Sequence, residues 1–138
     1  MIELTDEMAT LVDNALQDGL PCMMGTASKT GMPNISFRGS VMVFDKQHLA
    51  YWERAMNIAI HNLEGNPQIE ILYRGRERGV GWRFYGHAEI LRAGPLRDQI
   101  MSRTVQRELD RDPERNGFGV LITVDKVTDT GGNPLQER

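Results

Sequence analysis

Two side chains in the first half of the chain have the types and the spacing that could bind a phosphate group. Arg38 and Ser40 lie two residues apart in a segment with strand-like alternation, so they point to the same side of a strand. A guanidinium fork beside a hydroxyl suits phosphate oxygens, because both groups donate hydrogen bonds. The alternative is a solvent-facing arginine on a half-exposed strand, and spacing alone favours this plainer interpretation.

A second polar group lies where an expected strand is followed at once by an expected helix. Trp52, Glu53, Arg54 and Asn57 form this corner. A helix N-terminus offers unpaired N–H groups and a positive partial charge, so it attracts phosphate. Arg54 could add a cation, and Trp52 a flat apolar wall. A helix cap beside a core tryptophan explains the same residues, and the sequence leaves both interpretations open.

Motifs of several other chemistries are absent. The chain has no phosphate-binding glycine loop, no dinucleotide-binding glycine pattern, no serine-hydrolase elbow and no paired-histidine metalloprotease motif. His48, His61 and His87 lie far apart, so we predict no metal site, and we name no catalytic residue. A single cysteine, Cys22, excludes an internal disulfide and is typical of a small buried apolar residue.

Length and composition limit the class of protein. With 138 residues the chain has room for one domain, residues 1–138, around one core. A net charge of −3 argues against nucleic-acid binding. No apolar run is long enough to cross a bilayer, and the acidic N-terminus does not resemble a targeting peptide. We therefore expect a cytoplasmic protein without nucleic-acid or membrane partners.

The elements that must position these residues mix strands and helices without regular alternation. Period-two alternation predicts strands, and apolar residues at helical spacing predict helices. The strands are expected over residues 22–27, 34–44, 49–52, 68–73, 80–91 and 120–127. The helices are expected over residues 5–17, between Asn57 and Gly65, and over residues 94–109, and residues 130–138 are expected to be loose.

Details of these strands favour an antiparallel sheet. In the strand 34–44, Ile35 and Phe37 share an apolar side, whereas Arg38 and Ser40 share a polar one. Gly86 interrupts the long strand 80–91 and predicts a bulge. Strands joined by hairpins, with three helices between them, predict a mainly β fold, an antiparallel barrel with flanking helices.

Three motifs occur in a fixed order along the chain. They are a G-x-P turn at residues 31–33, a helix that ends in "NLEGNPQI" before a strand, and the strand "FYGHAEIL". Their order and spacing resemble those of the pyridoxamine 5′-phosphate oxidase-like flavoproteins, the FMN-binding split barrels. The resemblance covers most of the chain, roughly residues 11–125.

This resemblance implies an antiparallel split β-barrel of the FMN-binding type, usually a homodimer with FMN at the interface between protomers. It also implies oxidoreductase chemistry on a small-molecule substrate, because the flavin carries the redox reaction. In that family the polar strand and the strand-to-helix corner hold the cofactor. Carried over to this chain, the implied cofactor-binding residues are Arg38, Gly39, Ser40, Val41, Trp52 and Glu53, with Arg54 and Asn57 nearby.

Two features depart from the true pyridoxamine phosphate oxidases. Those enzymes carry an Arg-Lys pair at the beginning of the corner helix, where this chain has Ile58 and Ala59. Arg54 and Arg38 would then have to supply the charge. Those enzymes also have a C-terminal segment that holds pyridoxal phosphate, whereas this sequence ends at "NPLQER" soon after its last strand. We therefore do not expect pyridoxamine phosphate oxidation.

Two other functions remain open at this point. One is a module that binds flavin, deazaflavin or haem without turnover, and the other is a dimeric scaffold that has lost its cofactor. Haem would need an axial ligand, for which one of the three histidines or a methionine could serve.

Overall fold

Eight strands and four helices make up the computed structural model, which describes all 138 residues. The strands are β1 (Cys22–Ala27), β2 (Pro33–Arg38), β3 (Met42–Val43), β4 (His48–Glu53), β5 (Gln68–Arg74), β6 (Gly81–Leu91), β7 (Phe118–Thr128) and β8 (Pro134–Glu137). The helices are α1 (Asp6–Asp13), α2 (Ile58–Gly65), α3 (Pro95–Arg103) and α4 (Gln106–Leu109).

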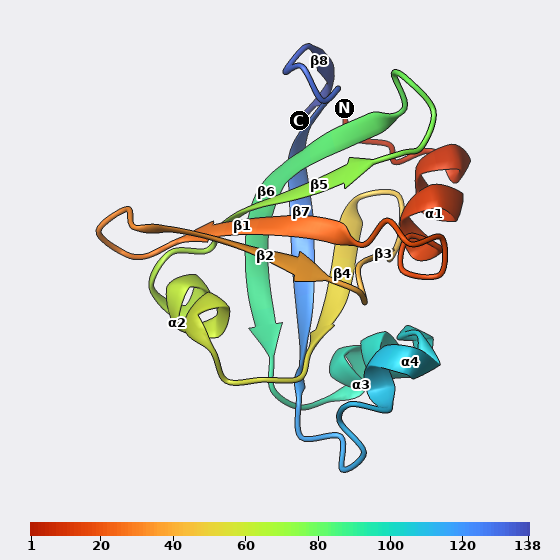
Figure 1. Cartoon of the computed structure of the whole chain (residues 1–138). Coiled ribbons are helices and arrows are strands. Elements are labelled where there is room, and N and C mark those ends of the chain that lie inside the picture. The colour runs from red at the N-terminus through yellow and green to blue at the C-terminus, as the bar shows by residue number, and fades with distance from the viewer.

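All strands belong to one antiparallel sheet that curls into a half-barrel. The order is β2–β1–β5–β6–β7–β4–β3, and β8 pairs with β7 outside this order. In Figure 1, α1 lies beside one end of the curled sheet, and α2, α3 and α4 lie toward the other end. The mainly β, antiparallel split-barrel fold expected from the sequence is therefore confirmed.

The predicted strand 34–44 is two strands, β2 and β3, with residues 39–41 between them. The physical reason is Ser40, whose hydroxyl accepts a hydrogen bond from the Trp52 N–H at 3.0 Å and donates one to the Trp52 carbonyl at 3.1 Å. The Ser40 side chain therefore occupies the N–H and the carbonyl of Trp52, to which the backbone of a neighbouring strand would otherwise bind. Because β2 and β3 are the two edges of the sheet, this linker joins the open sides of the barrel.

The apolar side of β2 faces outward. Ile35 and Phe37 are 68% and 69% exposed, and they pair in register with Gly25 and Met23 of β1. Directly paired residues share one face of a sheet, so this outer face carries large apolar side chains that nothing in the chain covers. The side that carries Arg38 turns inward instead.

Three further expectations from the sequence were wrong in detail. The helix 94–109 is two helices, because Thr104 has extended backbone angles and its hydroxyl donates to the Ile100 carbonyl at 2.7 Å. The helix 5–17 ends as α1 at Asp13, and turns follow it. The tail is not loose, since β8 pairs with β7 and Glu137 lies opposite Lys126.

Other expectations were confirmed. The bulge lies at Gly86, where the pairing of β6 with β7 shifts register. A Cβ at this position would collide with the Thr123 carbonyl oxygen, so glycine is required by close backbone approach. Cys22 is buried, as a small apolar residue would be, and burial raises the pKa of its thiol to about 12, which keeps it protonated and unreactive.

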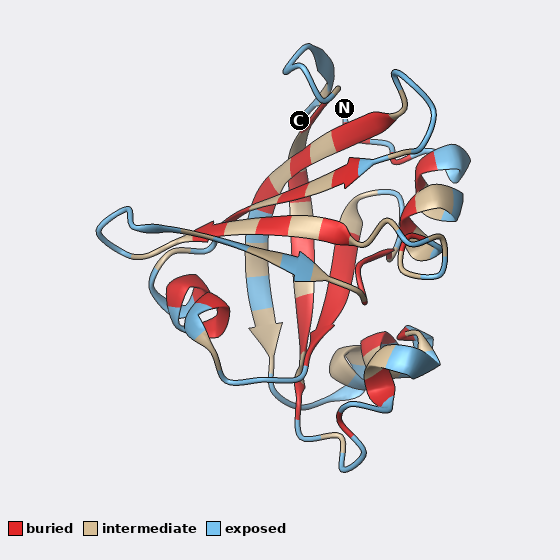
Figure 2. Cartoon of the chain, viewed as in Figure 1, coloured by how far each residue is buried: buried red, intermediate tan, exposed pale blue.

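Two apolar clusters stabilise the fold. The larger one fills the barrel interior and includes Tyr51, Ile71 and Phe84. The smaller one, which includes Trp52, Ile100 and other apolar side chains, lies between the sheet and the α3–α4 segment. Figure 2 shows the buried residues concentrated along the strands that line the barrel.

None of the helices has both the length and the apolar character needed to span a membrane.

Candidate functional site

The ends of β2 and β4 are joined by a buried ion pair. Arg38 is the last residue of β2 and Glu53 the last of β4, and the Arg38 Nη1 lies 2.7 Å from the Glu53 Oε2. The two side chains are only 12% and 0% exposed. Arg38 also donates from Nε to the Ser36 hydroxyl at 3.2 Å, and its Cζ lies 5.7 Å from the centre of the Tyr51 ring. The cation predicted to hold phosphate is therefore already paired with a carboxylate predicted for the same site.

Two buried polar atoms beside this pair have no partner. They are the second carboxylate oxygen of Glu53, Oε1, and the hydroxyl of Tyr51. Burial raises the pKa of Glu53, although Arg38 acts in the opposite direction. Burial, and then the charge of Glu53, raise the pKa of Tyr51. We call the region where the end of β2 meets the end of β4 the seam of the barrel. The ion pair there leaves two buried polar atoms unsatisfied, and each such group costs on the order of 1–3 kcal/mol.

The linker between Arg38 and β3 is also enclosed. Ser40 and Val41 are buried, and the Ser40 hydroxyl is fully used by the backbone of Trp52. At Gly39 a Cβ would lie 3.0 Å from both the Glu108 carboxylate and the Leu16 side chain. Gly39 therefore fits between α4 and the turn that follows α1, and residues 39–41 present no free side chain to a ligand.

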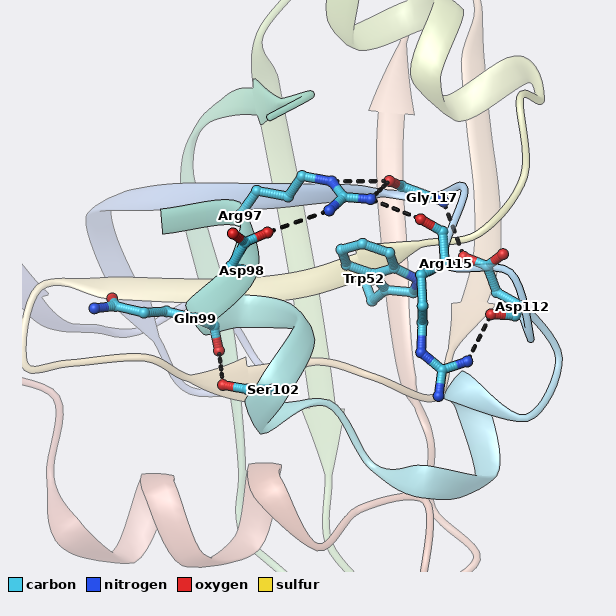
Figure 3. Close-up of polar contacts among 8 residues, drawn as sticks. All are labelled: Trp52, Arg97, Asp98, Gln99, Ser102, Asp112, Arg115 and Gly117. Atoms are coloured by element: carbon cyan, nitrogen blue, oxygen red, sulfur yellow. Dashed lines mark hydrogen bonds and ion pairs between the residues drawn. The ribbon is translucent and has the colours of Figure 1, made fainter. Parts of the chain in front are cut away.

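Trp52 is held by a carboxylate that sequence reasoning missed. Its indole N–H donates to the Asp112 Oδ2 at 3.0 Å (Figure 3). Asp112 also accepts from the backbone N–H groups of Asn116 at 3.0 Å and Gly117 at 2.9 Å. Burial acts to raise the pKa of Asp112, but these hydrogen bonds outweigh it and hold the pKa below its ordinary value. The only feature of the sequence that pointed to such a partner was Trp52 itself, because a buried indole N–H needs an acceptor.

An arginine on α3 covers the same tryptophan. The Arg97 Cζ lies 4.9 Å from the centre of the Trp52 ring. Its guanidinium donates to the carbonyls of Arg115 at 2.7 Å and Gly117 at 3.0 Å, and Figure 3 shows these contacts around one face of the indole. Trp52 is only 3% exposed. Its ring therefore belongs to the packing between β4, α3 and the loop before β7.

The chain becomes open immediately after Glu53. Arg54 is exposed and takes part in none of the ion pairs of the chain. Asn57 caps α2 as predicted, with its side-chain oxygen accepting from the Ala59 N–H at 3.1 Å. On either side of Asn57, Met56 and Ile58 are 57% and 56% exposed. This open corner combines a free cation, a helix N-terminus and two uncovered apolar side chains.

The eight residues predicted to bind the cofactor thus fall into two groups. The closed group is enclosed in the seam, and its members contact one another or the neighbouring helices: Arg38, Gly39, Ser40, Val41, Trp52 and Glu53. The open corner contains Arg54 and Asn57. Contact of either group with a cofactor stays a prediction.

The two groups differ in how well they suit a phosphate. A phosphate dianion near Arg38 would compete with the Glu53 carboxylate and would be repelled by it. At the open corner a dianion would meet the unpaired guanidinium of Arg54 and the first turn of α2, where Asn57 already binds the Ala59 N–H and the other N–H groups have no intrahelical partners. The residues present therefore fit the phosphate end of FMN at the corner and not in the seam.

The histidines occupy other parts of the surface. His48 contacts Asp45 at 2.8 Å, His87 contacts Asp125 at 2.9 Å, and His61 lies 3.4 Å from Glu64. No group of three His, Cys, Asp or Glu side chains in the chain could hold a metal ion.

Comparison with solved structures shows where the same fold occurs. HupZ from Group A Streptococcus superimposes with a TM-score of 0.77 at 27% identity, over 96% of this chain and 99% of HupZ. An FMN-binding protein from Syntrophomonas wolfei has a TM-score of 0.66 at 14% identity, over 90% of this chain and 86% of that one. An F420 reductase has a TM-score of 0.66 at 12% identity, over 91% of this chain and 98% of that one.

Comparison of sequences gives the family. No curated protein sequence matches the chain. The family model described as pyridoxamine 5′-phosphate oxidase matches residues 5–130, which include the barrel, the seam and the open corner. Together with the split-barrel fold, this match means that the chain belongs to the pyridoxamine 5′-phosphate oxidase-like family.

Proposed function

We propose that this protein binds FMN and acts as a small-molecule oxidoreductase, with the flavin phosphate at the open corner. The observation that carries the proposal is the combination at this corner of an unpaired arginine, Arg54, with the capped N-terminus of α2. Ile58 and Ala59, at the beginning of α2, carry no charge, so Arg54 and the helix terminus would supply the compensation for a dianion there.

The apolar side chains at the corner suit the other end of the ligand. Met56 and Ile58 are among the few large apolar side chains that the chain leaves exposed. A flavin joins a charged phosphate to a flat, largely apolar ring, so it needs a cation and an apolar surface within reach of each other. A bound flavin would supply the redox chemistry, and the residues of this chain would bind and orient it.

We propose further that a second copy of the chain completes the site. Met32, Ile35 and Phe37 are 67%, 68% and 69% exposed on β2 and the turn before it. Contiguous exposed apolar side chains mark protein interaction surfaces, and two-fold dimers are the commonest soluble assemblies. We expect the parent protein to sediment as a dimer. Phe37→Glu should shift it to monomer, whereas the control Leu135→Glu, at an exposed apolar residue of β8, should not.

The absorption spectrum of the purified protein, before and after addition of FMN, tests the cofactor. Flavin bands that stay with the protein through gel filtration support the proposal. A Soret band would identify a haem-binding module instead. A spectrum that stays blank after incubation with FMN would leave a dimeric scaffold as the function and would overturn the proposal. A bound deazaflavin, the cofactor type of the alternative module, would be recognised by mass spectrometry of the released ligand.

A further inference from the structure

A pocket lies far from the open corner. It is formed between α1, the turn that follows α1, and the hairpin that joins β5 to β6, and its volume is about 330 Å³. Figure 1 shows α1 beside this hairpin and α2 toward the opposite end of the sheet. Leu11, Leu20, Tyr73 and Val80 form its apolar wall. Pockets of this size hold small organic ligands.

Tyr73 presents a polar group that the protein itself does not use. The residue is only 2% exposed, yet it lines the pocket, and its hydroxyl takes part in none of the hydrogen bonds of the chain. The ring is fixed from behind by Trp82, since the two ring centres lie 5.7 Å apart in a stacked arrangement. Tyr51 and Glu53 carry the only buried side-chain polar atoms that lack a partner, so the Tyr73 hydroxyl is reached by solvent at the pocket, and its capacity for hydrogen bonding is available to a ligand there.

The charges around the pocket are mainly negative. Glu7, Asp18 and Glu77 line it, and Arg76 is its one cation. None of the three carboxylates takes part in an ion pair. The Arg76 guanidinium donates to the backbone carbonyl of Asp18, which leaves the Asp18 carboxylate free. Burial, and then the charge of Asp18, raise the pKa of Tyr73, which keeps its hydroxyl neutral and able to accept a hydrogen bond.

We propose that this pocket binds a small organic amine with an apolar body. An ammonium group would donate to the Tyr73 hydroxyl oxygen and to the Asp18 carboxylate, neither of which is hydrogen-bonded within the chain. The apolar body would pack against Leu11, Leu20 and Val80. The site is independent of the flavin proposed for the open corner.

The test uses three probes that differ mainly in charge. Phenethylammonium is the cation, 2-phenylethanol its neutral counterpart and 3-phenylpropionate the anion, and their binding to the full chain is measured by calorimetry and amide chemical shifts. We expect the cation to bind about tenfold or more tightly than the alcohol, and the anion not to bind. Shifted amides should lie in α1 and the β5–β6 hairpin. Equal affinity for cation and alcohol, or no binding of the cation, would overturn the proposal.

Two conservative variants locate the binding groups. Tyr73→Phe and Asp18→Asn should each weaken phenethylammonium binding by about tenfold. Tyr85→Phe, on the outer face of β6, and Asp110→Asn, at the exposed end of α4, are the matched controls and should leave it unchanged. Because the Tyr73 hydroxyl has no partner in the protein, Tyr73→Phe should fold normally. Unchanged binding in both pocket variants would refute the assignment even if the amine binds.

Discussion

Arg38 and Arg54 both lie next to Glu53, but only Arg38 forms an ion pair. Arg38 is buried in the seam and paired with Glu53 at 2.7 Å. Arg54, the residue immediately after Glu53, is exposed and forms no ion pair, although its charge also acts to lower the pKa of Glu53. The first arginine joins the edge strand β2 to β4, the neighbour of the other edge strand, and the second remains available to a ligand.

The difference comes from topology rather than from residue type. β2 and β3 are the edges of the sheet, so the residues that link them must close the split side of the barrel. Arg38, Ser40 and Glu53 do this with side-chain contacts. The corner lies beyond the last residue of β4, where no strand continues the sheet, so its side chains stay uncovered. Residues of the closed group therefore close the barrel, whereas residues of the open corner are free to bind.

The largest expected effect is on the stability of the seam. Arg38→Met would leave the Glu53 carboxylate buried without its cation, and Glu53→Leu would leave the Arg38 guanidinium buried without its carboxylate. Each single change should lower the free energy of unfolding by about 3–5 kcal/mol. The double variant should lose less than either single one, because an apolar pair replaces the ion pair. Denaturant unfolding measures all three.

The matched control for these three variants is a substitution of Arg54, the exposed arginine of the open corner. Arg54→Ala should change the free energy of unfolding by no more than about 0.5 kcal/mol, as exposed substitutions usually do. A large loss at Arg54 together with a negligible one at Arg38 would reverse the comparison.

The next effect concerns the carboxylate behind Trp52. Asp112→Ala removes the acceptor of the indole N–H and of two backbone N–H groups. We expect a loss of about 2–3 kcal/mol in the free energy of unfolding. Asp110→Ala, at a neighbouring exposed carboxylate, should have little effect. Trp52 fluorescence should report the freed indole, and an unchanged emission maximum would contradict this role.

A smaller effect is the opposite pH dependence of two carboxylates. The pKa of Glu53 is raised above its ordinary 4.5, so its contribution to stability is present at low pH and is lost as the pH rises through the raised value. The pKa of Asp112 is lowered below its ordinary 3.8, so its contribution is present above that value and is lost on acidification through the lowered one.

Thermal unfolding from about pH 3 to about pH 8 tests this contrast. The stability of the parent relative to Glu53→Gln should fall as the pH rises. Its stability relative to Asp112→Asn should rise over the acidic part of the range. Parallel slopes for the two variants would mean that the two carboxylates do not differ in environment.

Local signals in the sequence gave most of the elements correctly. The alternation of apolar and polar residues predicted the long strands, Gly86 predicted the bulge, and Asn57 predicted the cap of α2. These features depend on residues close together in the chain. The order of the three family motifs added the split-barrel topology, which no local pattern contains.

The candidate site could be predicted only in outline. Arg38 and Glu53 were both chosen, but nothing in the spacing says that they pair with each other across the seam. Asp112 and Arg97 were missed, because their contact with Trp52 brings together segments far apart in the sequence. The outward direction of Phe37 was also missed, since alternation shows which residues share one side of a strand but not which side faces the interior.

The central claim is that Arg54, and not the paired arginine in the seam, meets the flavin phosphate. Because riboflavin lacks this phosphate, the ratio of its Kd to the Kd of FMN isolates the contact. The ratio is measured for the parent, Arg54→Ala and Arg78→Ala, an exposed arginine in the β5–β6 hairpin. We predict that Arg54→Ala reduces the ratio by about tenfold with riboflavin affinity unchanged, and that Arg78→Ala leaves it as in the parent. An unchanged ratio in Arg54→Ala, or a parallel loss of both ligands, would contradict the account.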